Sequence, residues 1–319
     1  MSAPRVIALS GGIGGAKLAL GLYRLLPEAL AVIVNTGDDF EHLGLTICPD
    51  VDTALYTLAG LANPELGWGR RDESWTFMRA LAELGGETWF RLGDADLALH
   101  IERTRRLQAG ETLSKVITDV ARRLGITAAV LPMSDAPVRT RILTATGELA
   151  FQDYFVRRRC EPQITALRFD GAARALPAPA AIAALTSPAA EAIVICPSNP
   201  YLSIDPILAV PGFRRLLADS VAPVIAVTPL IGGEAVKGPT AKIMAELGVP
   251  TTPAAIAQHY EGLLDGFVLD ERDASCAREL TVAVHVTDTL MRSLADRERL
   301  AREVLAFAAK LPRTRMERG

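Results

Sequence analysis

The sequence predicts an α/β protein with a Rossmann-like, mostly parallel, doubly wound sheet. Two observations carry this prediction. Apolar runs of strand length alternate with helical segments, which is typical of parallel sheets covered by helices on both faces. The first of these runs leads into a glycine-rich turn and then a helix, as in nucleotide-binding α/β folds. The chain has 319 residues, half of them hydrophobic, so it can bury a large core.

Seven apolar segments are predicted to form the strands of the sheet. They are Val6–Leu9, Ala31–Asn35, Ala128–Leu131, Ala192–Cys196, Pro223–Val227, Gly266–Leu269 and Thr281–Val286. Each is followed by a small or polar cluster of residues. In open parallel sheets, ligands bind in the crevice at the carboxyl ends of the strands. We therefore expect these seven loops to border one functional cleft.

The clearest helices are predicted from their ends. They are Ala16–Leu26, Thr112–Leu124, Pro239–Leu247 and Ala295–Leu311. Thr112 is suited to cap a helix N-terminus, and Gly125 is suited to end the same helix. Proline at the start of the third helix fits a first helical position.

We expect a single Rossmann-like domain over residues 1–319, interrupted twice. A mainly helical insertion is predicted at about 50–125, and a β-hairpin insertion at about 137–175. A second extended pair is expected near Asp170-Gly171. The Pro/Ala-rich run at 175–190 is interpreted as a surface connection.

Composition and charge exclude several classes of protein. The net charge of −3 argues against a nucleic-acid binder. The four cysteines are far apart and form no CxxC pair, which indicates reduced thiols and neither a disulfide framework nor a zinc site. No secretion leader and no membrane-spanning apolar run is recognisable, so we expect a cytoplasmic protein without membrane contact. Arg103, Arg105 and Arg106 are interpreted as a helix surface, with the alternative that one of them faces an anionic ligand. The arginines at 157–159 are interpreted as a solvated strand edge.

Residues 6–17, which read VIALSGGIGGAK, are the most informative segment. Glycines after a strand let backbone N–H groups approach a ligand, and the following helix points its positive end at the same place. A phosphate or diphosphate fits such a site. The candidate phosphate-binding residues here are Gly11, Gly12, Gly14, Gly15 and Lys17.

The glycine segment departs from both common templates. A dinucleotide fingerprint starting at Gly12 requires Gly or Ala where Lys17 stands, and a Walker A loop requires Gly before the lysine and Ser or Thr after it. These departures argue against an ordinary NAD-dependent oxidoreductase and against an ordinary P-loop ATPase. The alternative is a tight turn that only packs the helix against the sheet.

Acidic residues follow the second strand and begin the next helix. Asp50 and Asp52 are close together, and two acids exceed what a helix cap requires. A pair of carboxylates beside a phosphate loop is a common way to hold Mg²⁺, so both are candidate metal ligands. Asp38 and Asp39 could hold ribose hydroxyls or simply form a turn.

The remaining polar candidates favour phosphoryl-group chemistry. Ser198 and Asn199 follow a buried strand and could hydrogen-bond a phosphate or a ribose, while the acids at 270–273 either bind a ligand or form a solvated turn. The four histidines show no ligand spacing and are interpreted as structural, and no nucleophile elbow occurs. Phosphoryl transfer depends on positioning and charge neutralisation, which the glycine turn, Lys17 and Mg²⁺ could supply.

Ten motifs follow one another along the chain. They are SGGIGGAK (10–17), VNTGDD (34–39), ICPDVDTALYTLAG (47–60), GWGRRDESW (67–75), RLGDADLALHI (91–101), LPMSDAPVRT (131–140), FQDYFV (151–156), CPSNPYLSIDPIL (196–208), VTPLIGGEAVKGP (227–239) and DERD (270–273). This ordered set resembles the 2-phospho-L-lactate transferase family of coenzyme F-420 biosynthesis, which is called CofD in archaea and FbiA in actinobacteria. The motifs cover nearly the whole chain in the family's order.

The resemblance implies a reaction and its substrates. A phosphorylated three-carbon acid (2-phospholactyl, phosphoenolpyruvyl or 3-phosphoglyceryl) moves from a GMP-diphosphate-linked donor to the ribityl hydroxyl of the deazaflavin Fo. The products are F-420-0 or its analogue and GMP. Mg²⁺ is the implied metal, and a homodimer is the implied assembly. The segments at 47–60 and 67–75 look more like bacterial members, which argues against phospholactate as the acid.

The resemblance also implies roles for particular residues. Asp50 and Arg91 match the family's Fo site, and Asp50 could bind metal, orient the attacking hydroxyl, or both. The glycine turn with Lys17, Ser198 and Asn199 would hold the diphosphate or nucleotide, and Asp50 and Lys17 are the catalytic candidates. The alternative is the related YvcK-like family, whose members share the glycine loop, bind nucleotide-sugars and act in regulation.

Overall fold

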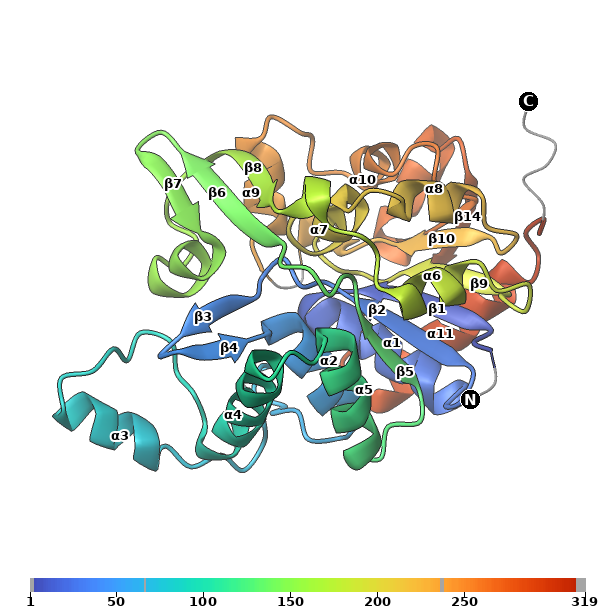
Figure 1. Ribbon diagram of the computed structural model, residues 1–319. Coiled ribbons are helices and arrows are strands. Elements are labelled where there is room, and N and C mark those ends of the chain that lie inside the picture. The colour runs from blue at the N-terminus through green and yellow to red at the C-terminus, as the bar shows by residue number, and fades with distance from the viewer. Residues whose placement is uncertain (1–2, 66, 236–237, 314–319) are drawn as a thin grey trace.

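The computed structural model of the chain, which describes residues 3–65, 67–235 and 238–313, is centred on a seven-stranded sheet. The strands lie in the order β14-β13-β10-β9-β1-β2-β5 (Figure 1). Their bounds are β1 (Val6–Ser10), β2 (Leu30–Val34), β5 (Ala129–Pro132), β9 (Ala192–Ile195), β10 (Val224–Val227), β13 (Gly266–Asp270) and β14 (Ala283–Thr287). All neighbouring pairs are parallel. The predicted parallel α/β fold is confirmed, and every predicted strand exists.

Successive side chains of the strands enter two cores on opposite faces of the sheet. In β1, Val6 and Ala8 belong to one core, and Ile7 and Leu9 belong to the other. The first core is covered by α1 (Gly12–Leu25), α2 (Pro49–Leu58), α5 (Leu113–Arg123) and α11 (Leu294–Ala308). The second is covered by α6 (Pro179–Leu185), α7 (Asp205–Ala209), α8 (Phe213–Ala218), α9 (Thr240–Glu246) and α10 (Pro253–His259). Burial on both faces explains why the strands are continuous apolar runs.

The helix ends agree with prediction in one case and differ in two. Thr112 caps α5 by accepting a hydrogen bond from the Lys115 amide, and Gly125 follows that helix with a φ of +76°. By contrast, α1 begins at Gly12, four residues before the predicted start, because the glycines themselves form its first turn. In α9, Pro239 is the residue before the first helical one. Within the described residues, no helix has the length and apolar character that a membrane span requires.

Smaller elements fill the connections. Between β2 and β5 lie β3 (Phe40–His42), β4 (Leu45–Ile47), α2, α3 (Thr76–Glu83), α4 (Asp94–Gln108) and α5. Between β5 and β9, β6 (Arg139–Thr144), β7 (Gly147–Ala150) and β8 (Ile164–Asp170) form an antiparallel sheet in the order β7-β6-β8. The short turns are η1 (Asp153–Arg157), η2 (Ala172–Arg174), η3 (Pro200–Ile204) and η4 (Glu271–Glu279), and β11 (Leu230–Ile231) pairs with β12 (Glu234–Ala235). Residues 236–237 of the motif at 227–239 lie outside the described residues.

Two local predictions in this region were wrong. No second extended pair forms at Asp170-Gly171, because β8 ends there and pairs with the free edge of β6. The run at 175–190 is not a surface connection, because it contains α6. Ala181 and Ala184 of α6 are buried, since small side chains let this helix approach the sheet closely.

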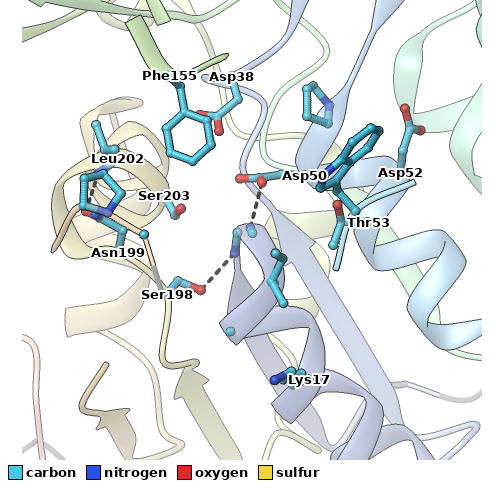
Figure 2. A pocket seen from close by; sticks show the side chains of 18 of the residues that line it. Lys17, Asp38, Asp50, Asp52, Thr53, Phe155, Ser198, Asn199, Leu202 and Ser203 are labelled. Carbon is cyan, nitrogen blue, oxygen red and sulfur yellow. Dashed lines mark hydrogen bonds between the residues drawn. The ribbon is translucent and has the colours of Figure 1, made fainter. Parts of the chain in front are cut away.

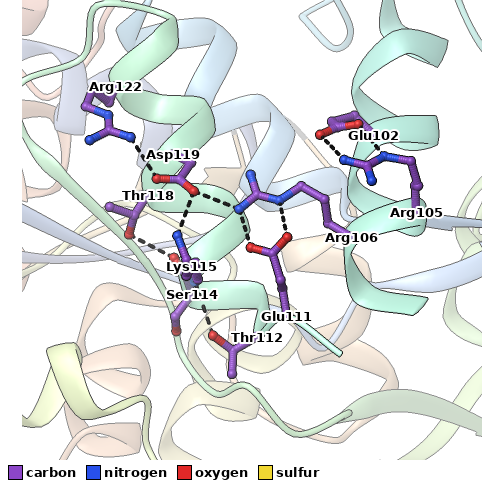
Figure 3. Close-up of polar contacts among 10 residues, drawn as sticks. All are labelled: Glu102, Arg105, Arg106, Glu111, Thr112, Ser114, Lys115, Thr118, Asp119 and Arg122. Carbon is purple, nitrogen blue, oxygen red and sulfur yellow. Dashed lines mark hydrogen bonds and ion pairs between the residues drawn. The ribbon is translucent and has the colours of Figure 1, made fainter. Parts of the chain in front are cut away.

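The arginines of α4 have three different environments. Arg106 donates to Glu111 at 2.9 Å and to Asp119 of α5 at 2.7 Å, which ties the two helices together (Figure 3). Arg105 is exposed and pairs with Glu102 on its own helix. Arg103 is 0% exposed and Arg106 is 8% exposed, so the predicted helix surface is wrong for both residues and holds for Arg105 alone. The buried charge of Arg103 is matched by the carboxylate of Asp52 on α2.

The other arginine run also differs from prediction. Arg157 ends the π-helical turn η1 and does not belong to a strand. Its guanidinium carbon lies 4.5 Å from the centre of the Trp89 ring. This contact joins η1 to the segment before α4.

Candidate functional site

A cavity of about 620 Å³ lies at the carboxyl ends of the central strands. Five of the seven predicted loops contribute to it, those after β1, β2, β9, β10 and β14. The loops after β5 and β13 do not line the cavity. At the end of β13, the Asp270 carboxylate instead accepts hydrogen bonds from the amide and hydroxyl of Thr289. The expected single cleft is therefore present, and five of the seven predicted loops line it.

The glycine turn joins β1 to α1 and forms part of the cavity wall. Gly12 has a φ of +61°, a conformation that glycine adopts without steric cost. Its amide donates to Asp50 Oδ1 at 2.7 Å, and the Gly11 amide donates to Ser198 Oγ at 3.1 Å (Figure 2). Two of the N–H groups predicted to face a phosphate thus face protein side chains here.

Close packing explains the other two glycines. A Cβ on Gly14 would lie 2.3 Å from the carbonyl oxygen of Pro197, and one on Gly15 would lie 2.3 Å from Ser198 Oγ. The packing alternative therefore accounts for part of the motif. Gly14 also lines the cavity, together with Gly11 and Gly12.

Asp50 lies at the start of α2 and links the glycine turn to the loop after β2. Its Oδ2 accepts a hydrogen bond from Asn35 Nδ2 at 2.9 Å, and the same nitrogen donates to Asp38 Oδ1 at 2.9 Å. Burial raises the pKa of Asp50 to about 6. Burial, followed by the nearby Asp50 charge, raises the pKa of Asp38 well above its ordinary value. Two buried carboxylates therefore converge beside the glycine turn, where a cation would be favourable.

Asp52 has different partners from Asp50, although both line the cavity. Its two carboxylate oxygens accept hydrogen bonds from Arg103, at 2.6 and 3.1 Å. Burial raises the pKa of Asp52 to about 6, against the opposing effect of the Arg103 charge. Figure 2 shows Asp50 directed toward the start of α1 and Asp52 lying apart from it. The two acids therefore have separate sets of hydrogen-bond partners.

The remaining predicted residues also border the cavity. Lys17 donates from Nζ to the Met291 carbonyl at 3.2 Å. Asn199 caps η3 by accepting from two backbone amides through Oδ1, and its Nδ2 donates to Thr240 Oγ1 at 3.0 Å. Asn199 therefore shapes the loop that carries Ser198. The Arg91 guanidinium carbon lies 4.0 Å from the centre of the Trp75 ring.

Aromatic side chains form another part of the cavity lining. They are Tyr56, Trp68, Trp89, Phe90, Phe151 and Phe155. The Phe151 and Phe155 rings are stacked at 5.3 Å, and Trp68 and Trp75 make an edge contact at 6.4 Å. Flat apolar walls of this kind suit a planar aromatic ligand. The cavity thus combines aromatic walls, Arg91 and the glycine turn at the start of α1.

Sequence reasoning missed several of these residues. Asn35 was not singled out, although it bridges Asp38 and Asp50. The aromatic lining comes from four separate segments, so no local spacing reveals it. Asp96 and His100 are four residues apart on α4, a spacing that places both on one helix face and could have been noticed.

Comparisons with known proteins agree with these features. The sequence matches the family described as 2-phospho-L-lactate transferase CofD over residues 6–305. A phosphoenolpyruvate transferase from Streptomyces griseus is 42% identical over 317 residues, which cover 96% of this chain and 99% of that protein. A 2-phospho-L-lactate transferase from Methanopyrus kandleri is 41% identical over 313 residues, covering 96% of this chain and 98% of that protein.

Solved structures show the same fold at much lower sequence identity. A UPF0052 family protein from Bacillus halodurans superposes with a TM-score of 0.64 at 16% identity. The match covers 96% of this chain and 99% of that protein.

Proposed function

Because the chain belongs to the 2-phospho-L-lactate transferase CofD family, and is thus a transferase, we propose the specific reaction that it performs. It transfers a phosphorylated three-carbon acid from a GMP-diphosphate-linked donor to the ribityl hydroxyl of Fo, giving F-420-0 or its analogue and GMP. One observation carries the proposal: a single cavity joins aromatic walls and Arg91 to the glycine turn and Asp50. The first part suits a deazaflavin ring, and the second suits a diphosphate.

The chemical step needs a nucleophile, a leaving group and charge neutralisation. The Fo hydroxyl attacks the phosphorus that bears the acid, a new P–O bond forms, and the P–O bond to GMP breaks. The hydroxyl proton passes to a carboxylate or to water. With a pKa of about 6, Asp50 is ionised at neutral pH and able to orient the hydroxyl. Lys17 and the N-terminus of α1 stabilise negative charge on the diphosphate.

The donor set beside the glycine turn fits Mg²⁺. Asp38 and Asp50 present two buried carboxylates on either side of Asn35 Nδ2, and Mg²⁺ prefers oxygen ligands. We assign the proposed Mg²⁺ to Asp50 with Asp38, because these two carboxylates converge on Asn35 beside the glycine turn, whereas Asp52 lies apart from them. When bound, the ion neutralises charge on the phosphate oxygens. The homodimer implied by the resemblance and the cytoplasmic location expected from the sequence stay predictions.

The acid of the donor is not selected by similarity alone. The Streptomyces protein named for phosphoenolpyruvate and the Methanopyrus protein named for 2-phospholactate are 42% and 41% identical to this chain. We propose that the acid is not phospholactate, because two of the motifs look bacterial. A comparison of the three conjugates as donors tests this choice directly.

Binding of Fo tests the assignment of the aromatic part of the cavity. Purified protein is titrated with Fo while the fluorescence of the deazaflavin is followed, in the wild type, in Arg91→Ala and in Arg71→Ala. We expect Arg91→Ala to weaken Fo binding at least tenfold, with a smaller effect on binding of the guanosine nucleotide. Arg71 is the matched control, because its exposed side chain lies outside the cavity.

Two outcomes would contradict the proposal at different levels. Equal Fo affinity in Arg91→Ala and the wild type would reject the assigned role of Arg91. Absence of saturable Fo binding by folded wild-type protein would reject the transferase reaction and favour a nucleotide-sugar-binding regulator.

A further inference from the structure

The cavity contains a second group of polar side chains, distinct from Asp38 and Asp50. Asp96 and His100 lie one turn apart on α4, and Asp52 approaches them from α2. Each of the three offers one ligand atom, and these atoms all lie within 4.8 Å of one another. All three residues line the cavity, so an ion could reach them from solvent.

His100 makes this group more than a cluster of acids. Its side chain is 2% exposed, and within the described part of the chain Nε2 has no hydrogen-bond partner. The nearest carboxylate oxygen, Asp96 Oδ2, is 3.3 Å from Nε2. Leaving a buried polar nitrogen without a hydrogen bond is unfavourable, and an imidazole nitrogen is a common metal ligand.

The distances are compatible with a small metal ion. Ligands about 2.0–2.1 Å from a tetrahedral ion lie about 3.3–3.4 Å apart. The separation of Nε2 and Asp96 Oδ2 already has this value. Atoms up to 4.8 Å apart need to close by about 1.5 Å at most.

Neighbouring side chains hydrogen-bond the two carboxylates of this group and do not fully neutralise their negative charge. Arg103 donates to both oxygens of Asp52, and the Tyr56 hydroxyl donates to Asp96 Oδ1. Contacts of this kind orient the ligands of a metal ion. The group has two carboxylates and only one guanidinium beside them, so its net charge favours the binding of a cation.

We propose that Asp52, Asp96 and His100 form a site for a divalent transition metal. One imidazole nitrogen with two carboxylate oxygens suits Zn²⁺, Co²⁺ or Mn²⁺ better than Mg²⁺, which prefers oxygen ligands alone. Because the group opens into the cavity, a fourth position is available to water or to an oxygen of a bound ligand. The site is independent of the proposed transferase reaction and of the Mg²⁺ assigned to Asp38 and Asp50.

Co²⁺ alone is the probe that tests this site. Purified chain without an affinity tag is titrated with CoCl₂, and the visible d–d absorption bands are recorded. We expect one equivalent to bind with bands of a four- or five-coordinate ion, and Zn²⁺ to displace it. His100→Ala should weaken binding at least tenfold. His285→Ala is the matched control, because His285 lies outside the cavity in a partly exposed pair with Glu303.

Further variants distinguish the two cation sites and guard against misfolding. Asp96→Asn, which keeps nearly the same shape, should also lose Co²⁺, whereas Asp38→Asn should retain it. Circular dichroism shows whether each variant is folded, and Asp96→Asn replaces His100→Ala if the latter is not. Absence of Co²⁺ binding by the wild type, or equal affinity in the folded variants of His100 and Asp96, would overturn the proposal.

Discussion

The substitution Asp50→Asn should increase stability while abolishing turnover. Burial raises the pKa of Asp50 from 3.8 to about 6. Because the folded-state pKa lies above the unfolded value, the folded chain loses stability as the pH rises from about 4 to about 6. At neutral pH this loss amounts to about 3 kcal/mol, at about 1.4 kcal/mol for each pKa unit. Asparagine removes the buried charge and hence this cost.

The gain is partly offset by lost hydrogen bonds. Asp50 accepts from the Gly12 amide through one oxygen and from Asn35 through the other, and asparagine has only one side-chain oxygen. One lost bond costs about 1 kcal/mol, and somewhat more if its donor stays buried. We expect a net gain of about 1–2 kcal/mol at pH 7.5, or a Tm higher by about 1.5–3 °C.

Thermal unfolding at pH 7.5 and at pH 5 measures this effect. The gain should shrink at pH 5, because most of the wild-type Asp50 is then protonated and uncharged. Asp94→Asn is the control and should lower stability. Hydrogen bonds from the Ser74 hydroxyl and from the Phe77 and Thr76 amides lower the pKa of Asp94 and stabilise its charge. An Asp50→Asn variant that is less stable at pH 7.5, or changed equally at both pH values, would refute the reasoning.

Three other substitutions give further tests. Arg103→Ala leaves Asp52 buried without its guanidinium partner and should cost about 3–5 kcal/mol in urea unfolding, whereas Arg105→Ala, at an exposed pair, should leave the unfolding free energy nearly unchanged. Equal effects of the two substitutions would contradict the assigned ion pair. Gly14→Ala forces a Cβ against the Pro197 carbonyl and should lower the unfolding free energy by about 2 kcal/mol, with a lower Tm and slower turnover. A variant with the melting temperature and rate of the wild type would show that the turn is not tightly packed. Arg106→Ala should lower the unfolding free energy by about 1–2 kcal/mol, because its contacts to Glu111 and Asp119 are lost. Fo binding should stay unchanged, and a change in Fo affinity would contradict the purely structural role of Arg106.

The strands and the position of the cavity were predictable because their signals are local. Each central strand is a short apolar run that ends in small or polar residues, and parallel connections bring those ends to one edge. The cap at Thr112 and the stop at Gly125 are equally local. The start of α1 was placed too late because glycine has low helix propensity, and here tertiary packing against Pro197 and Ser198 overrides it.

The composition of the site was only partly predictable because it depends on contacts between distant segments. Asp50 was identified, but its partner Asn35 was not, since the pairing exists only once β2 and α2 are packed. Arg103 looks like a surface residue from its charged neighbours, and only the position of Asp52 makes it a core residue. Pairing across elements is what the sequence alone could not show.

The most direct measurement of the proposed reaction is the formation of GMP that depends on Fo. Wild-type protein and Asp50→Asn are incubated with Mg²⁺, Fo and each of the three GMP-diphosphate-linked acids, and GMP and the Fo product are quantified by chromatography and mass spectrometry. We predict that one donor gives GMP and F-420-0 or its analogue in equal amounts, only when Fo is present, and that Asp50→Asn gives almost none. GMP release without Fo, or no product from any donor despite Fo binding, would contradict the proposed transfer.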